Sequence, residues 1–140
     1  VFEERSTWAE LTHKFEAVEH HDIIMVGEHM ILALYTPGHY IDSICYWSKS
    51  KNLIFTGDTM FVGRTGRTIS SRSSITDLYN STYQILLKLS SKTIVYPGHH
   101  YGFSKFISIA DNIKLSNFFQ CKSLEEFKIV MDNYENNKKK

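Results

Sequence analysis

The chain has 140 residues, of which 42% are hydrophobic, and its formal net charge is +1 at pH 7. A chain of this length can bury one hydrophobic core but is too short for two domains. A charge near zero gives no electrostatic reason to expect a nucleic-acid or membrane partner, and no apolar stretch has the length of a membrane span. Cys45 and Cys121 lack metal-type spacing, which indicates buried thiols in a reducing compartment. We therefore expect one domain in the cytoplasm.

The first half of the chain is predicted to form paired β-strands. Polar or glycine-containing turns separate four runs that are rich in β-branched and aromatic residues, at 22–27, 29–35, 43–48 and 53–56. Gly27 and Glu28 between the first two runs predict a tight hairpin turn. Residues 1–18 before them have only weak helical spacing.

The second half is predicted to alternate helices with one more strand. After a loop rich in Ser, Gly and Arg, residues 76–89 carry apolar side chains at helical spacing, with Ser74 or Thr76 as the cap and Asp77 in the first turn. A strand, two helices and a polar tail are predicted next, at residues 93–96, 104–119, 124–134 and 135–140. This order predicts an α/β fold in which helices pack on a sheet, within one domain at residues 1–134.

Three apolar runs end in a glycine turn that leads to a residue able to bind a metal. The turns read Thr-Pro-Gly-His up to His39, Phe-Thr-Gly-Asp up to Asp58 and Tyr-Pro-Gly-His up to His99. Proline fixes the approach of the chain and glycine permits a sharp reversal, so the next side chain points away from the strand end. An aspartate there is costly to bury unless a metal or a hydrogen-bond network compensates it. We therefore expect these three side chains to converge on a metal at the rim of the sheet.

The order of these turns, with Gly-x-x-Gly-Arg-Thr between the second and the third, resembles the metallo-β-lactamase superfamily, and within it the glyoxalase II and persulfide dioxygenase branch. The resemblance runs from about Asp22 to Gly102 and more weakly to Met131. It implies an αββα sandwich with metals at one edge between two sheets. The family's upstream His-x-His-x-Asp-His motif has no counterpart after Val1. The chain is therefore expected to be the C-terminal half of such a fold, with one sheet face uncovered.

The same resemblance implies a role for each of the three residues. In a hydrolase, His39 binds one of two metal ions, expected to be Zn²⁺, Asp58 bridges both ions and His99 binds the second. The ions activate a hydroxide that attacks a thioester such as a hydroxyacylglutathione, with Asp58 as the catalytic residue. In a persulfide dioxygenase, one Fe²⁺ is held by His39, Asp58 and an upstream histidine, while His99 is only a neighbour. A third interpretation is a non-catalytic fragment or binding module. The hydrolase is the favoured prediction.

Residues near the predicted substrate entrance leave the identity of the substrate undecided. Only residues 100–140 follow the last ligand, too few for the helical glutathione-binding domain of glyoxalase II, which favours the dioxygenase. The sequence Gly-Arg-Thr-Ile at residues 66–69 departs from the Gly-Arg-Thr-Asp of that branch. Arg67 is predicted to clamp a substrate carboxylate, such as one of glutathione, by a bidentate hydrogen bond, or else to belong to a solvated basic loop. Tyr101 is predicted to line the pocket, or else to be a packed ring.

Overall fold

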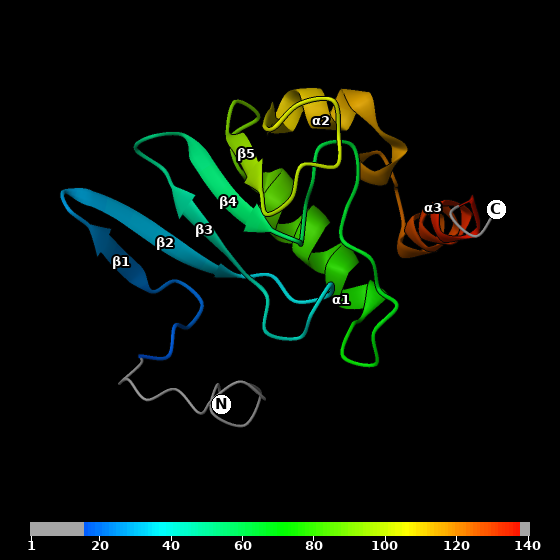
Figure 1. Ribbon diagram of the computed structural model, residues 1–140, viewed down its shortest axis with the longest axis horizontal. Helices are drawn as coiled ribbons and strands as arrows, with labels where there is room; N and C mark the ends of the chain where they lie inside the picture. Colours follow the sequence, from blue (N-terminus) through cyan, green and yellow to red (C-terminus); the bar gives the residue numbers. More distant parts are fainter. Residues whose placement is uncertain (1–15, 138–140) are drawn as a thin grey trace.

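The computed structural model describes residues 16–137 and is built around one six-stranded sheet (Figure 1). The strands follow the chain order across the sheet, as β1 (Ile23–Val26), β2 (His29–Tyr35), β3 (Ile44–Ser48), β4 (Leu53–Gly57), β5 (Ile94–Pro97) and β6 (Ile107–Ser108). Neighbouring strands are antiparallel, except that β4 and β5 are parallel. The weak helical spacing noted in residues 1–18 falls mostly on residues 1–15, which lie outside the described residues.

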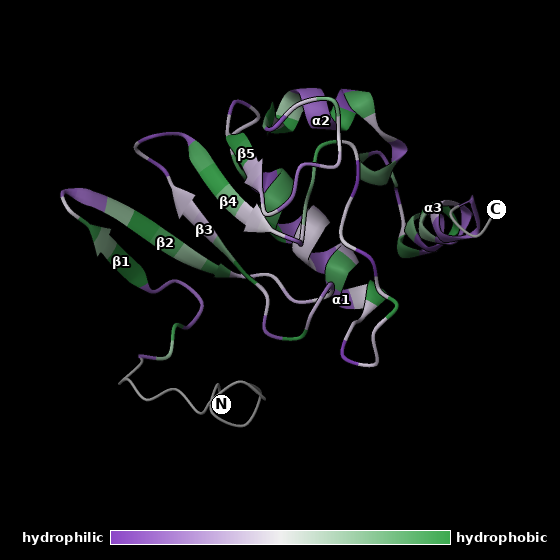
Figure 2. Cartoon of the chain, viewed as in Figure 1, coloured by the Kyte–Doolittle hydropathy of each residue, from purple (hydrophilic) through white to green (hydrophobic). Residues whose placement is uncertain are grey.

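The first four strands agree with their predicted runs to within one residue at each end. β1 and β2 form the predicted hairpin, with Val26 opposite His29 on either side of the Gly27-Glu28 turn. The hairpin extends away from the helices, and Figure 2 shows apolar residues along both of its strands. Ile23 and Met30 on this hairpin are 61% and 59% exposed. Their apolar character therefore agrees with strand formation but does not bury them in the core of this chain.

The strand directions place three strand ends at one edge of the sheet. β3 is antiparallel to both β2 and β4, so β2 and β4 run in the same direction, and β5 is parallel to β4. The carboxyl ends of β2, β4 and β5 therefore lie at the same edge. The parallel pair requires a long crossover, which residues 58–93 supply.

That crossover contains the helix predicted at residues 76–89, in an irregular form. It begins as α1 (Ile75–Asn80), continues as a π-helix at Ser81–Ile85 and ends as a 3-10 turn at Leu86–Lys88. Ser74 is the cap, because its side chain accepts a hydrogen bond from the backbone N–H of Asp77 at 3.2 Å.

The helix predicted over residues 104–119 is confirmed only in part, over Ile109–Leu115. Residues 107 and 108 instead form β6, where Ile107 pairs with Val95, and only then does α2 (Ile109–Leu115) begin, followed by a 3-10 turn at Asn117–Phe119. Ser108 is extended, with φ −72° and ψ 152°, and its side chain accepts from the backbone N–H of Asp111. Because residues 107 and 108 pair with β5 and Ser108 caps the helix, the helix starts only at Ile109. The last helix, α3 (Leu124–Asn137), extends three residues beyond its predicted end at 134.

The helices cover one face of the sheet and leave the other exposed. The core consists of strand residues that alternate toward the helices and of apolar residues from every helical segment, among them Leu34, Cys45, Ile54, Val95, Leu78, Leu86, Ile109, Phe118, Phe127 and Met131. On the other face, Phe55 and Tyr96 are 44% and 37% exposed, and their ring centroids lie 5.8 Å apart. The predicted α/β layering is confirmed, and residues 16–137 leave this second face of the sheet exposed. Among residues 16–137, no helix combines the length and apolar character needed to cross a bilayer.

Candidate metal centre

The three glycine turns meet at the edge where β2, β4 and β5 end. Asp58 follows β4 directly, and its carboxylate lies between two histidines. Its Oδ1 is 2.7 Å from Nδ1 of His99, and its Oδ2 is 3.7 Å from Nε2 of His39. The structure thus brings together the three residues that were predicted as metal ligands, and the common direction of the three strands is the reason.

The ring of His39 has a defined orientation. Its Nδ1 lies 2.8 Å from the backbone carbonyl oxygen of Arg67. A carbonyl can only accept, so Nδ1 carries the proton and donates, and in the neutral ring Nε2 keeps its lone pair on the side of Asp58. Histidines that bind metals usually donate their second ring N–H to a carbonyl or carboxylate in this way. His39 is therefore oriented as a metal ligand would be.

The turn before His39 is fixed to the crossover helix. The hydroxyl of Ser81 donates to the carbonyl of Pro37 at 2.7 Å, and the N–H of Ser74 donates to the carbonyl of Gly38 at 2.8 Å. Gly38 has φ +138°, and a Cβ at this position would lie 2.2 Å from the backbone nitrogen of Leu78. Only glycine allows so close an approach. Ser81 begins the π-helical stretch, and such stretches are frequent at functional sites.

Gly66 lies directly against two of the predicted ligands. A Cβ here would be 2.1 Å from the backbone oxygen of Asp58 and 2.8 Å from Cβ of His39. Its N–H donates to the carbonyl of Thr59 at 3.1 Å. From the sequence, Gly66 is recognised only as part of the Gly-x-x-Gly-Arg-Thr motif and has no assigned role. Its place in that motif is the available sign that it lies at the site.

Arg67 points its side chain toward helix α3. Its Nε donates to Oε1 of Glu135 at 2.7 Å, and a second, parallel hydrogen bond joins its terminal nitrogen to Oε2. The hydrogen bonds to Glu135 raise the pKa of Arg67 above its ordinary value. The sequence has no signal for this pair, which joins residues 68 positions apart. The role of Arg67 in substrate binding stays a prediction.

Tyr101 packs on the third predicted ligand. Its ring stacks on His99 with centroids 5.3 Å apart and an interplanar angle of 19°, yet the residue is 59% exposed. The guanidinium carbon of Arg64 lies 4.5 Å from the Tyr101 centroid and 4.6 Å from that of Phe61. Tyr101 therefore lies beside the site with one side open, and its contact with a substrate stays a prediction.

The donor set fits a divalent metal, although no closed metal site is formed. In residues 16–137, no group of three or more His, Cys, Asp or Glu side chains is arranged to hold a metal ion. The hydrogen bond between His99 and Asp58 joins two of the predicted donor atoms directly to each other. Two imidazoles and one carboxylate are nevertheless the ligands that zinc and non-haem iron prefer. We conclude that His39, Asp58 and His99 fit a metal by chemistry and by proximity.

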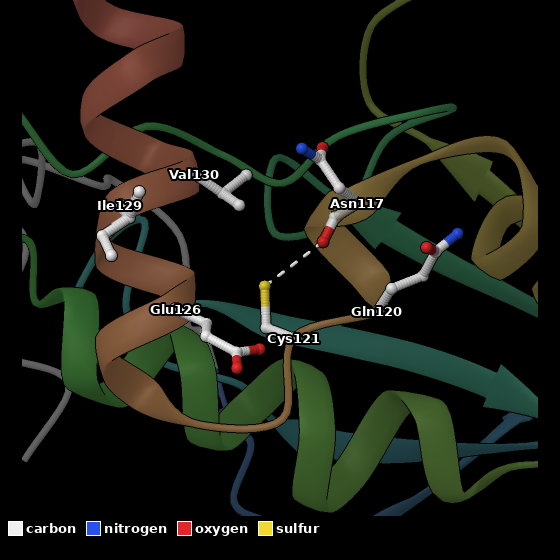
Figure 3. Close-up of a pocket in the computed structure, with 6 residues that line it drawn as sticks. All are labelled: Asn117, Gln120, Cys121, Glu126, Ile129 and Val130. Carbon is white, nitrogen blue, oxygen red and sulfur yellow. Dashed lines mark hydrogen bonds between the residues drawn. The ribbon is translucent and has the colours of Figure 1, made fainter.

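A pocket of about 320 Å³ lies apart from this centre, between α3 and the 3-10 turn that follows α2 (Figure 3). Within it, the thiol of Cys121 donates to the carbonyl of Asn117 at 3.2 Å. Its lining consists of Asn117, Gln120, Cys121, Glu126, Ile129 and Val130. None of these is a predicted site residue, so the pocket is not part of the metal centre.

Comparison with known proteins relates the chain to metal-dependent hydrolases. It is 42% identical over 82 residues to the probable hydroxyacylglutathione hydrolase glo2 of Schizosaccharomyces pombe, covering 57% of this chain and 31% of the relative. It is 35% identical over 112 residues to the probable polyketide biosynthesis zinc-dependent hydrolase PksB of Bacillus subtilis, covering 79% of this chain and 48% of the relative. The chain thus spans less than half the length of these two curated relatives.

Solved structures share the fold. The crystal structure of ETHE1 from Myxococcus xanthus has a TM-score of 0.76 and 38% identity, over 84% of this chain and 51% of that chain. A metallo-β-lactamase from Staphylococcus aureus has a TM-score of 0.75 at 22% identity, over 84% of this chain and 38% of that one, and supports the fold alone. The model of the metallo-beta-lactamase superfamily matches residues 6–99, well over half of the sequence. The chain therefore belongs to the metallo-β-lactamase superfamily.

Proposed function

We propose that this protein is a metal-dependent hydrolase that cleaves a thioester, such as a hydroxyacylglutathione. The observation that carries the proposal is the position of Asp58, whose two carboxylate oxygens face His99 and His39 separately, at 2.7 and 3.7 Å. A carboxylate with one oxygen toward each histidine is suited to serve two cations, one on either side. The relatives named hydroxyacylglutathione hydrolase support this reaction class.

His39, Asp58 and His99 would hold the metal ions in this proposal. Zn²⁺ is the proposed ion, because imidazole and carboxylate are among its usual ligands and one relative is named a zinc-dependent hydrolase. When bound, such ions lower the pKa of a water to about 7 and polarise a carbonyl.

The chain contributes orientation and charge. The carbonyl of Arg67 keeps the proton of His39 on Nδ1, Gly66 allows the loop to approach both ligands, and Asp58 places a negative charge between the histidines. These residues would hold the ligands in place before substrate arrives, so that little reorganisation accompanies the reaction.

A small glutathione conjugate is the proposed substrate class. Tyr101 offers an exposed ring next to His99 against which the substrate can pack. A substrate carboxylate could reach the guanidinium of Arg67 only by competing with Glu135, which already accepts two hydrogen bonds from it. We therefore place Tyr101 ahead of Arg67 as a substrate contact.

A persulfide dioxygenase with one Fe²⁺ is the second candidate. The 38% identity to ETHE1 from Myxococcus xanthus, over 84% of this chain, favours it. In that case His39 and Asp58 would be ligands, and the hydrogen bond from His99 would orient the Asp58 carboxylate from outside the coordination sphere.

Metal content per chain, measured by elemental analysis on the full-length protein, tests the two candidates. About two zinc ions per chain would support the hydrolase, because both sides of Asp58 would then be used. About one iron per chain would favour the dioxygenase. Protein that contains no metal and gains none on incubation with Zn²⁺ or Fe²⁺ would contradict both and leave a non-catalytic fold.

Substitution of His99 separates the candidates independently. His99→Ala is expected to remove one metal ion and lower thioester hydrolysis by a factor of at least about 100, since a metal ligand is lost. A one-iron dioxygenase would keep its iron in the same variant. Asp58→Ala is expected to abolish activity in either case. His29→Ala, on the exposed hairpin, is the matched control and should retain activity; full activity in Asp58→Ala would refute the site.

A further inference from the structure

Helix α3 makes a direct connection to the metal centre through one ion pair. The carboxylate of Glu135 accepts two hydrogen bonds from the guanidinium of Arg67. Their side chains are only 16% and 35% exposed. A bidentate, partly buried pair of this kind is better defined and stronger than a typical surface ion pair. The side chain of Arg67 is therefore held in place by the C-terminal turns of α3.

Arg67 also carries the carbonyl that orients His39. The hydrogen bond from Nδ1 of His39 ends on the backbone oxygen of Arg67 at 2.8 Å. The preceding residue, Gly66, leaves no free space, since a single added Cβ would lie 2.1 Å from the Asp58 backbone. Because the loop is packed so closely, a shift of the Arg67 backbone would either lengthen the hydrogen bond to His39 or displace the backbone of Asp58.

Two further contacts tie the same loop to the same helix. The hydroxyl of Thr65 donates to Sδ of Met131 at 3.4 Å, with both residues buried. The guanidinium carbon of Arg64 lies 5.4 Å from the ring centroid of Tyr134. Residues 64, 65 and 67 thus each contact α3, so the helix determines where the loop lies against the predicted ligands.

We propose that Glu135 is a positioning residue for the metal centre and acts through Arg67 on His39. This proposal rests on the metal site of the proposed function. Both Glu135 carboxylate oxygens already accept hydrogen bonds from the guanidinium of Arg67, whereas His39 contacts the backbone oxygen of that residue. The contribution of Glu135 is to keep the Arg67 carbonyl where Nδ1 of His39 donates, so that Nε2 stays the free nitrogen.

The test uses the full-length protein with Glu135→Ala, and with Glu125→Ala as the matched control. Glu125 is an acidic residue of the same helix that pairs with Lys128 at the surface, and its side chain is 75% exposed. Zn²⁺ affinity is measured by competition with a chromophoric chelator. Glu135→Ala should weaken Zn²⁺ binding by about tenfold, the lower end of the range for groups that orient metal-bound histidines. Glu125→Ala should bind Zn²⁺ as the wild type does.

A second measurement reads His39 without any metal. The ¹⁵N chemical shifts of the His39 ring should report a proton on Nδ1 in the wild type and a mixture of tautomers in Glu135→Ala. A charge swap adds a rescue: Arg67→Glu and Glu135→Arg should each impair both readouts, and the double variant should restore them.

Two results would overturn the proposal. One is an unchanged Zn²⁺ affinity and an unchanged His39 tautomer in Glu135→Ala, even if that variant unfolds at a lower temperature, because the role would then be structural only. The other is a double variant no better than the single ones. Failure of the wild type to bind Zn²⁺ would refute the proposed function instead, and the tautomer of His39 would still decide whether Glu135 positions it.

Discussion

At the scale of single residues, the candidate site depends on close backbone approaches at two glycines as much as on the proposed ligands. Gly66 lies against Asp58 and His39, and Gly38 lies against the backbone of Leu78. Neither glycine has a side chain that could bind a metal, but each lets two backbone segments meet where a side chain would separate them. Neither carries a titratable group, so their role is steric.

Gly66→Ala tests this view. The added Cβ would clash with the carbonyl of Asp58 at 2.1 Å, so we expect a loss of at least about 2 kcal/mol in the free energy of unfolding, together with weaker Zn²⁺ binding. The control is Gly27→Ala, which meets no atom within 4 Å but has φ +60°. That change should cost only the backbone penalty of about 1–2 kcal/mol and leave metal binding intact. Equal metal affinity in both variants would contradict the role of Gly66. Urea unfolding and chelator competition measure the two quantities.

Cys45 illustrates a residue whose environment suppresses its chemistry. Its side chain is fully buried, with Sγ 3.1 Å from the hydroxyl of Thr36. Burial raises the pKa of the Cys45 thiol to about 11. At about pH 8 only roughly 0.1% of it is thiolate, the reactive form. We expect iodoacetamide to label Cys45 slowly in the native chain and rapidly in guanidinium, as followed by peptide mass spectrometry. Rapid native labelling would contradict this environment.

At the scale of elements, α3 has two separate tasks along its length. Its first half packs into the core, where Phe127 is fully buried and makes ring contacts with Tyr79, Tyr83 and Phe118. Its last turns carry Tyr134 and Glu135, which contact the loop at the metal centre. The same helix therefore supports both the fold and the site.

Phe127→Ala should destabilise the chain by about 3–5 kcal/mol, because a large buried ring leaves a cavity. Ile129→Ala is the matched control on the same helix. Ile129 is 60% exposed, so its replacement should change the free energy of unfolding by no more than about 0.5 kcal/mol. Denaturant unfolding followed by circular dichroism compares the two, and similar losses would argue against the packing of α3 described above.

At the scale of the whole molecule, the sheet formed by residues 16–137 has one face covered by the described helices and one open face. The helices bury one face, whereas the other carries the exposed rings of Phe55, Tyr96 and Phe106, whose neighbouring centroids lie 5.8 and 5.4 Å apart. Exposed apolar patches of this kind bind apolar probes.

The 140-residue chain is accordingly expected to bind the dye ANS on this open face. Replacing Phe55 and Tyr96 together by Ser should reduce the ANS fluorescence several-fold, since the change removes two of the three neighbouring rings. Ile69→Ser, which removes an exposed residue of the loop before α1, should leave it unchanged. A double variant as fluorescent as the unaltered chain would place the apolar binding surface elsewhere.

The strands and the proposed ligands can be recognised in the sequence because their signals are local. The four runs before residue 58 are rich in β-branched and aromatic residues and end in turns, and His39, Asp58 and His99 each follow a glycine turn directly. The apolar run at 104–119 could not be resolved in this way. Its period fits a helix, but Ile107 forms a bridge with Val95, and such strand pairing depends on a partner distant in the chain.

By itself, then, the sequence determined the order of the first strands, the family and the residues proposed as ligands, since each is encoded within a few consecutive residues. Only the tertiary structure decided that Asp58 lies between the two histidines, because that position requires β2, β4 and β5 to end at one edge. It also decided that Arg67 faces Glu135 across 68 positions. Such contacts follow from the packing of α3 on the loop, and no local pattern records them.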